Sequence, residues 1–139
     1  MENKRTIGTT FLQIALGLLF IVSGIWTVQG ANGDDVASAI KSLFSSADLA
    51  SILCVVFGVI EIVVGFFLLL RLFVNLSTAL DTVLMVVIML SWIVMIVMMD
   101  FIGSKGLLKN LGNASDFCGA LQRFAMHLLV LGAIIKVKD

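Results

Sequence analysis

Glu61 is the residue of this 139-residue chain whose setting points most clearly to chemistry. It is the single charged residue in an apolar stretch that runs from Leu49 to Leu70. A carboxylate in the middle of such a stretch is costly to bury, so it either pairs with a cation or stays protonated. The functional reading is a group that relays a proton or hydrogen-bonds a ligand. The alternative is a buried polar network that only fixes helix register.

Arg123 and His127 are the candidate partners of Glu61. They are four residues apart, which places them on one face of a helix. The sequence therefore predicts that these three side chains line a polar site or proton path. Arg71 and Asp81 flank a short connection, and we expect them to form a local ion pair.

The two cysteines, Cys54 and Cys118, are expected on the same side of the molecule. They could form a thiol pair or disulfide in an oxidising compartment. The alternative is two inert thiols, which is the common fate of free cysteine. With one histidine and two cysteines the chain has no spacing typical of a metal site, so we expect none.

The composition excludes most classes of soluble protein. Hydrophobic residues make up 60% of the chain, charged residues 13%, and the mean hydropathy is +1.16. Soluble domains are about 45–50% apolar and about 25% charged. The net charge is zero, so there is no basic excess for a nucleic-acid partner. These values indicate an integral membrane protein.

Four apolar segments are long enough to cross a bilayer, which takes about 17–25 residues. They cover residues 10–28, 49–70, 77–99 and 121–137. The first has a basic start like a signal peptide, but its apolar core is too long for one, so we expect a transmembrane helix. Between the first two segments, Val36, Ile40, Leu43 and Phe44 fall at helical spacing. The sequence predicts one all-α domain over residues 1–139, an integral membrane four-helix bundle with a short interfacial amphipathic helix between helices 1 and 2.

Small residues define the faces on which these helices are expected to pack. Gly58 and Gly65 share a face with Ser51, Cys54 and Glu61, at spacings of three and four. The first segment has a similar face, made of Gln13, Gly17, Phe20, Gly24 and Thr27. Glycines let helix backbones approach closely in lipid, so we expect the two faces to meet.

The basic residues predict the orientation of the chain. With the N-terminus inside, the cytoplasmic side holds Lys4, Arg5, Arg71, Lys136 and Lys138. The outer side holds Lys41, Lys105 and Lys109, with Arg123 at the border. Positive residues favour the cytoplasmic side, so both termini are expected in the cytoplasm.

Two of these segments resemble the DoxX family of small membrane proteins. Residues 16–25 (LGLLFIVSGI) look like the family's opening helix, and residues 58–70 are similar to its G-x-x-E-x-x-x-G segment. Residues 129–133 fit more loosely. The chain departs from the family at Thr27, where a lysine is frequent, and at residues 135–139, which replace a glycine-rich end.

The resemblance implies a four-helix subunit of a redox-related, quinone-linked complex in the bacterial inner membrane. DoxX relatives include subunits of thiosulfate:quinone oxidoreductase. Its partners would be the lipid bilayer and either oxidoreductase subunits or further copies of the chain, and it would not be catalytic alone. Glu61 is the residue carried over, with Gly58 and Gly65 beside it. A small proton-coupled transporter and a structural subunit or assembly factor are the alternatives.

Overall fold

The computed structural model describes residues 6–139, so Lys4 and Arg5 lie outside the described residues. All of its regular elements are helical: α1 (Ile7–Val28), α2 (Asp35–Leu43), α3 (Ala47–Leu70), α4 (Thr78–Ile96), the π-helix η1 (Val97–Ile102), the 3-10 helix η2 (Leu107–Lys109) and α5 (Ala114–Lys138). Four helical stretches are long and apolar enough to cross a membrane. The predicted all-α class, with four spanning helices and a short helix after the first, is confirmed.

Two differences from the predicted bounds bear on the site. α5 begins at Ala114 rather than near Leu121, because the Asn113 side chain accepts a hydrogen bond from Ser115 N and caps it. The first turns of α5 are polar, so hydropathy alone did not reveal them. α4 ends as an α-helix at Ile96 and continues as η1 to Ile102, beyond the predicted end at Met99.

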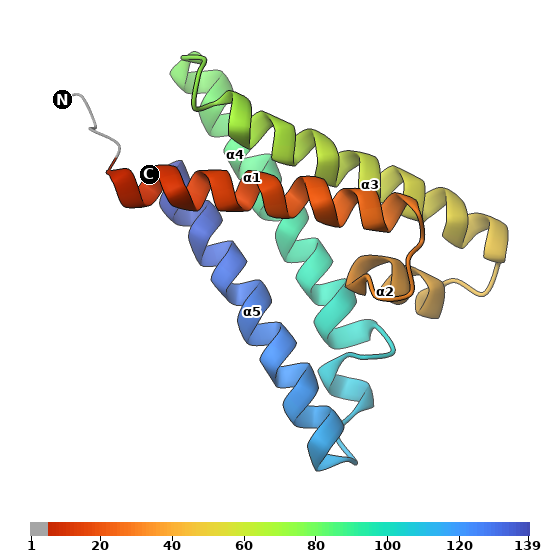
Figure 1. Cartoon of the computed structure of the whole chain (residues 1–139). Helices are drawn as coiled ribbons and strands as arrows, with labels where there is room; N and C mark the ends of the chain where they lie inside the picture. The colour runs from red at the N-terminus through yellow and green to blue at the C-terminus, as the bar shows by residue number, and fades with distance from the viewer. Residues whose placement is uncertain (1–5) are drawn as a thin grey trace.

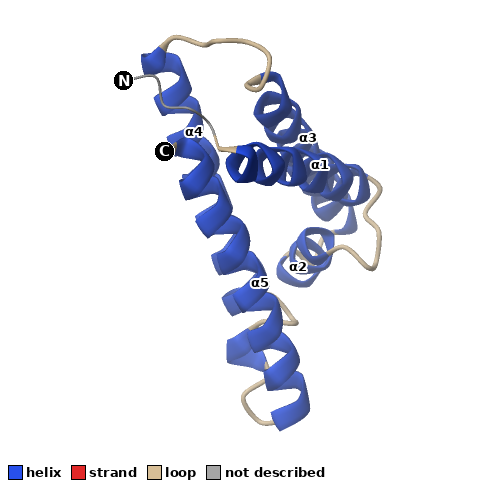
Figure 2. Ribbon diagram, turned by 60° about the vertical axis from the view of Figure 1, so that its left-hand side comes forward, coloured by secondary structure: helices blue, strands red, loops and turns tan. Residues whose placement is uncertain are grey.

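The helices form a V of two pairs, α1 with α3 and α4 with α5 (Figure 1). The start of α1, the connection from α3 to α4 and the end of α5 meet at one end, which we call the closed end. At the other end, the open end, α2 lies between the arms of the V (Figure 2). Phe20 of α1 contacts Trp92 of α4 edge to face at 5.2 Å and links the two pairs.

The glycines of α1 and α3 face one another. A Cβ added to Gly58 would lie 2.6 Å from Gly24 O, and one added to Gly65 would lie 2.6 Å from Gly17 O. The backbones of α1 and α3 are therefore in direct contact at two levels. Cys54 and Glu61 are buried on the same face of α3, whereas Ser51 is exposed and does not belong to it.

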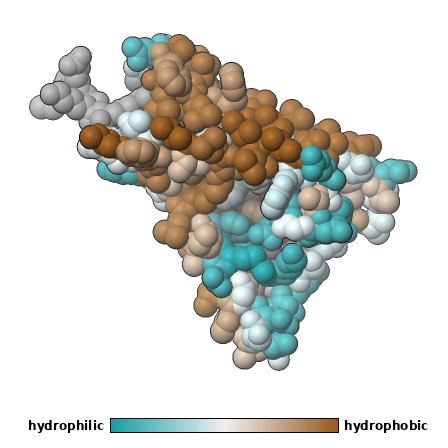
Figure 3. Space-filling view, in the orientation of Figure 1, coloured by the Kyte–Doolittle hydropathy of each residue, from teal (hydrophilic) through white to brown (hydrophobic). Residues whose placement is uncertain are grey.

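The surface of the V separates into two zones. Large apolar side chains are exposed along all four long helices, among them Val63, Phe66 and Leu129. Figure 3 shows this apolar surface over α1 and α3, and a hydrophilic surface where α2 and the open end lie. Apolar side chains exposed over a whole face suit contact with lipid, as expected for a multi-pass membrane protein.

Arg71 holds the closed end together. Its guanidinium is paired with the Asp81 carboxylate, as the sequence predicts, and Nη1 donates to Val137 O at 2.8 Å. One side chain thus joins the end of α3 to the start of α4 and the end of α5. Only 8% of Arg71 is exposed, so these bonds are largely shielded from water.

An Arg71→Gln variant is expected to lower the free energy of unfolding by about 2 kcal/mol, since it removes charge-assisted bonds to two helices. Thermal unfolding in detergent would measure the loss. An Arg71→Lys variant keeps the charge but lacks the planar guanidinium. Its stability is expected to lie between that of the unmodified protein and that of Arg71→Gln. Unchanged stability of Arg71→Gln would show that the closed end holds without this contact.

Candidate functional site

A groove of about 490 Å³ lies between α1 and α5 at the open end of the V. Its walls are apolar, from Leu19 and Val22 on α1 to Met126 and Val130 on α5. Both tryptophans of the chain, Trp26 and Trp92, line it. Val22, Trp26 and Met126 are more than half exposed, so the groove opens sideways between the two helices.

The polar end of the groove is built on a buried aspartate–histidine pair. His127 Nδ1 lies 2.7 Å from Asp100 Oδ2. Asp100 is almost fully buried, while His127 keeps part of its ring exposed to the groove. Trp92 Nε1 donates to His127 O at 3.1 Å, and the two rings meet edge to face at 5.7 Å. The imidazole is therefore held from two sides.

The π-helix η1 places Asp100 against His127. Its wider turns are visible in the hydrogen bond from Gly103 N to Met98 O, which spans five residues. π-helical turns carry an extra residue and are frequent at functional sites. The sequence did not single out Asp100, because a carboxylate after an apolar run is typical of a helix end.

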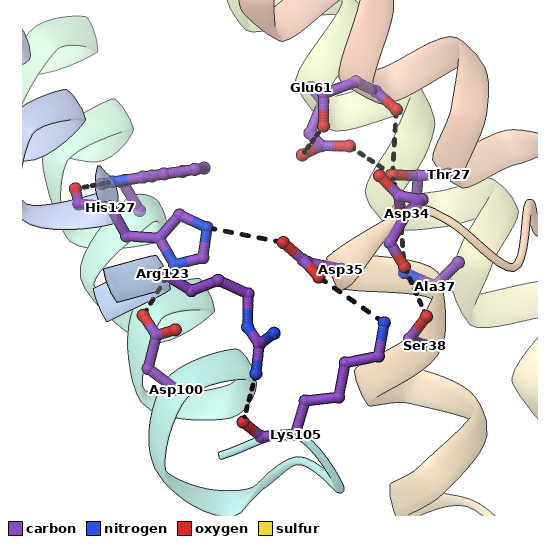
Figure 4. Close-up of polar contacts among 12 residues, drawn as sticks. Thr27, Asp34, Asp35, Ala37, Ser38, Glu61, Asp100, Lys105, Arg123 and His127 are labelled. Atoms are coloured by element: carbon purple, nitrogen blue, oxygen red, sulfur yellow. Dashed lines mark hydrogen bonds and ion pairs between the residues drawn. The ribbon is translucent and has the colours of Figure 1, made fainter. Parts of the chain in front are cut away.

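Three more charged groups surround the polar end. Asp35 Oδ2 lies 4.0 Å from His127 Nε2, and Lys105 Nζ lies 4.0 Å from Asp35 Oδ1. Arg123 Nη2 donates to Lys105 O at 2.7 Å. Figure 4 shows these side chains facing one another across the space between α2 and α5.

Glu61 belongs to a second polar cluster, which borders the groove through Ser23 and Asp34. Its Oε2 accepts from Thr27 Oγ1 at 2.8 Å, and its Oε1 accepts from Ser23 Oγ at 3.2 Å. Thr27 Oγ1 also lies 2.9 Å from Asp34 Oδ2, and Asp34 accepts from Ala37 N at 2.7 Å. Glu61, Thr27 and Asp34 are all buried, so the hydroxyl that the two carboxyl groups share is shielded from solvent.

The structure does not bring Glu61 to its expected partners. Among the described residues, its hydrogen bonds go to hydroxyl groups of α1, while Arg123 and His127 make their contacts with Lys105 and Asp100. The reason is the glycine face, which packs α3 against α1 and so turns Glu61 towards α1 and α2. Figure 4 shows Glu61 and His127 in separate parts of the view.

The hydroxyl of Thr27 has one hydrogen but three neighbouring acceptors: Glu61 Oε2, Asp34 Oδ2 and Ser23 O. It cannot donate to both carboxyl groups at once. A proton on either carboxyl group lets that group donate to Thr27, which then donates to the other. The cluster is therefore complete when it holds one proton.

The two cysteines differ in burial. Cys54 is a buried free thiol in α3, and Cys118 is an exposed free thiol near the start of α5. Within residues 6–139, no group of three or more histidine, cysteine or acidic side chains is arranged to hold a metal ion.

The comparison with protein families covers the first three long helices, including the segment around Glu61. The family model DoxX matches residues 8–96, which is more than half of the chain. The chain belongs to the DoxX family. This confirms the resemblance seen in the sequence. Thr27, Asp34 and Glu61 lie in the matched part of this DoxX-family protein, whereas Asp100, Arg123 and His127 lie beyond it.

One relative covers the whole chain. It is an "Uncharacterized protein" of Treponema pallidum (strain Nichols), 29% identical over 142 residues, which cover 100% of this chain and 98% of the relative. No solved structure matches this DoxX-family protein.

Proposed function

We propose that this DoxX-family protein is a non-catalytic membrane subunit of a redox assembly and binds the head group of a quinone-type lipid in the groove between α1 and α5. The observation that carries this proposal is the form of the groove. It has apolar walls, an opening towards lipid and a polar end built from Asp35, Arg123 and His127. Ligand sites typically combine apolar walls with a few convergent polar groups.

Both the head group and the alkyl tail of a quinone-type lipid suit this groove. The aromatic head group would lie between Trp26 and Trp92, and its oxygens would reach the polar end. The alkyl tail would leave through the opening between α1 and α5, where Val22 and Met126 are exposed. An apolar tail needs no aqueous path, because the bilayer is its solvent.

The Glu61 cluster is proposed as the proton store of this site. Thr27 links Glu61 to Asp34 by hydrogen bonds, and Asp34 itself lines the groove. A proton held by the cluster would therefore lie at the wall of the groove. We place the protein in the bacterial inner membrane with the closed end and both termini in the cytoplasm, in agreement with the distribution of basic residues.

Tryptophan fluorescence tests the proposal directly, because both tryptophans line the groove and quinones quench indole emission on contact. Titration of the detergent-solubilised protein with decylubiquinone is expected to give saturable quenching. A Val130→Phe variant fills the groove and is expected to weaken binding about tenfold, the effect of roughly 1.4 kcal/mol. Trp26→Phe and Trp92→Phe variants assign the signal to each ring.

Leu128→Phe is the matched control, since Leu128 is exposed on α5 and does not line the groove. It should bind decylubiquinone like the unmodified protein. Equal quenching of the Val130→Phe and Leu128→Phe variants would mean that the quinone only partitions into detergent, and it would overturn the proposal. Mass spectrometry of the gently purified protein would identify any oxidoreductase subunits bound to it.

A further inference from the structure

The polar end of the groove presents hydrogen-bond acceptors to a ligand. An ionised carboxylate only accepts hydrogen bonds, so Asp100 Oδ2, at 2.7 Å from His127 Nδ1, requires the hydrogen on Nδ1. In the neutral form of the ring, this tautomer leaves the Nε2 atom with a free lone pair. Such a second partner on the other ring nitrogen is what normally sets the tautomer of a histidine.

The neighbours of Nε2 add to this acceptor character. Asp35 Oδ2, 4.0 Å away, is an acceptor as well. Among the described residues no donor contacts Nε2 itself: Arg123 Nη2 donates to Lys105 O, and Lys105 Nζ lies 4.0 Å from Asp35 Oδ1. A group that enters between His127 and Asp35 therefore meets two acceptors, and a hydroxyl can donate its one hydrogen to His127 Nε2.

We propose that the groove selects the reduced, hydroxyl-bearing form of its lipid. This inference rests on the proposed function and names the ligand state. A hydroquinone hydroxyl donates to His127 Nε2, whereas the oxygen of a quinone only accepts and leaves Nε2 without a partner. The preference concerns binding alone, and no electron moves in it.

Asp100 is a positioning residue in this scheme. It does not reach the ligand, but it fixes which nitrogen of His127 carries the hydrogen. In an Asp100→Asn variant the amide can donate to Nδ1, so the ring hydrogen can move to Nε2. The ring then becomes a donor towards the groove and favours a quinone carbonyl over a hydroxyl.

The test compares three probes that differ only in the head-group oxygens: decylubiquinol, decylubiquinone and the dimethyl ether of decylubiquinol. Anaerobic equilibrium dialysis of the whole detergent-solubilised chain measures each affinity. Decylubiquinol is expected to bind about tenfold more tightly than the other two, the effect of one satisfied acceptor. The ether keeps the reduced ring but lacks the hydroxyl, so it separates hydrogen bonding from redox state.

Asp100→Asn is expected to bring the ratio of quinol to quinone affinity to one or below, whereas Asp48→Asn, an exposed acid of α3, should leave it unchanged. The three-probe comparison in the unmodified protein stands even if Asp100→Asn does not fold. In the unmodified protein, binding of decylubiquinone as tight as or tighter than that of decylubiquinol would overturn the inference and leave the proposed function intact. Absence of saturable binding for all three probes would overturn both.

Discussion

Replacement of Gly58 by alanine is expected to lower the free energy of unfolding by about 3 kcal/mol, because overpacking of a close contact typically costs 1–3 kcal/mol. The new Cβ would lie 2.6 Å from both Gly24 O and Val28 N. These are backbone atoms of α1, which cannot move away as a side chain can. The two helices must therefore separate along their length, and Glu61 would move away from Thr27. Thermal unfolding in detergent measures the effect.

Gly132 provides the matched control. It lies in α5, and a Cβ added there would meet nothing within 4 Å. A Gly132→Ala variant should keep or slightly raise stability, because alanine favours a helix by up to about 1 kcal/mol over glycine. If Gly58→Ala were as stable as Gly132→Ala, the close contact of α1 and α3 would be wrong.

Replacement of Thr27 by valine is expected to cost about 3 kcal/mol, since loss of the hydroxyl leaves two buried carboxyl groups without their shared partner. Valine has nearly the shape of threonine, so packing is preserved. Thr27→Ser keeps the hydroxyl and should retain most of the stability. Chemical denaturation followed by circular dichroism would compare the three proteins.

A double-mutant cycle with Glu61→Leu sharpens this prediction. Without the Glu61 carboxyl group, the Thr27 hydroxyl has one buried acceptor fewer. Thr27→Val should therefore lower the free energy of unfolding by at least 1 kcal/mol less in the Glu61→Leu background, as expected for residues in one hydrogen-bond network. Additive effects of the two substitutions would contradict the network and would leave Thr27 with a local role in α1.

The sequence alone predicted the elements better than their arrangement. The four spanning helices follow from hydropathy, because the bilayer imposes a length on every apolar segment. The glycine faces follow from spacings of three and four, which are a local property of a helix. Glu61 stood out for the same local reason, as one charge among apolar residues.

The partners of each polar residue could not be predicted in this way. The contact of Glu61 with Asp34 and that of His127 with Asp100 depend on how α2 and η1 dock between distant helices. Asp34 caps the start of α2, and that common role gives no sign of its second contact with Thr27. The contact of Asp100 could not be predicted at all, because nothing in the sequence around it indicates a π-helical turn.

The π-helical turn of η1 makes the groove sensitive to the insertion or deletion of a single residue. Consecutive residues of an α-helix are rotated by about 100°, because there are 3.6 residues per turn. Deletion of one codon between Val97 and Met99 is expected to rotate Asp100 away from His127, while α1, α3 and the glycine contacts stay intact. A one-codon insertion or deletion would thus change what the groove binds in a single step, without a substitution of any residue that lines it.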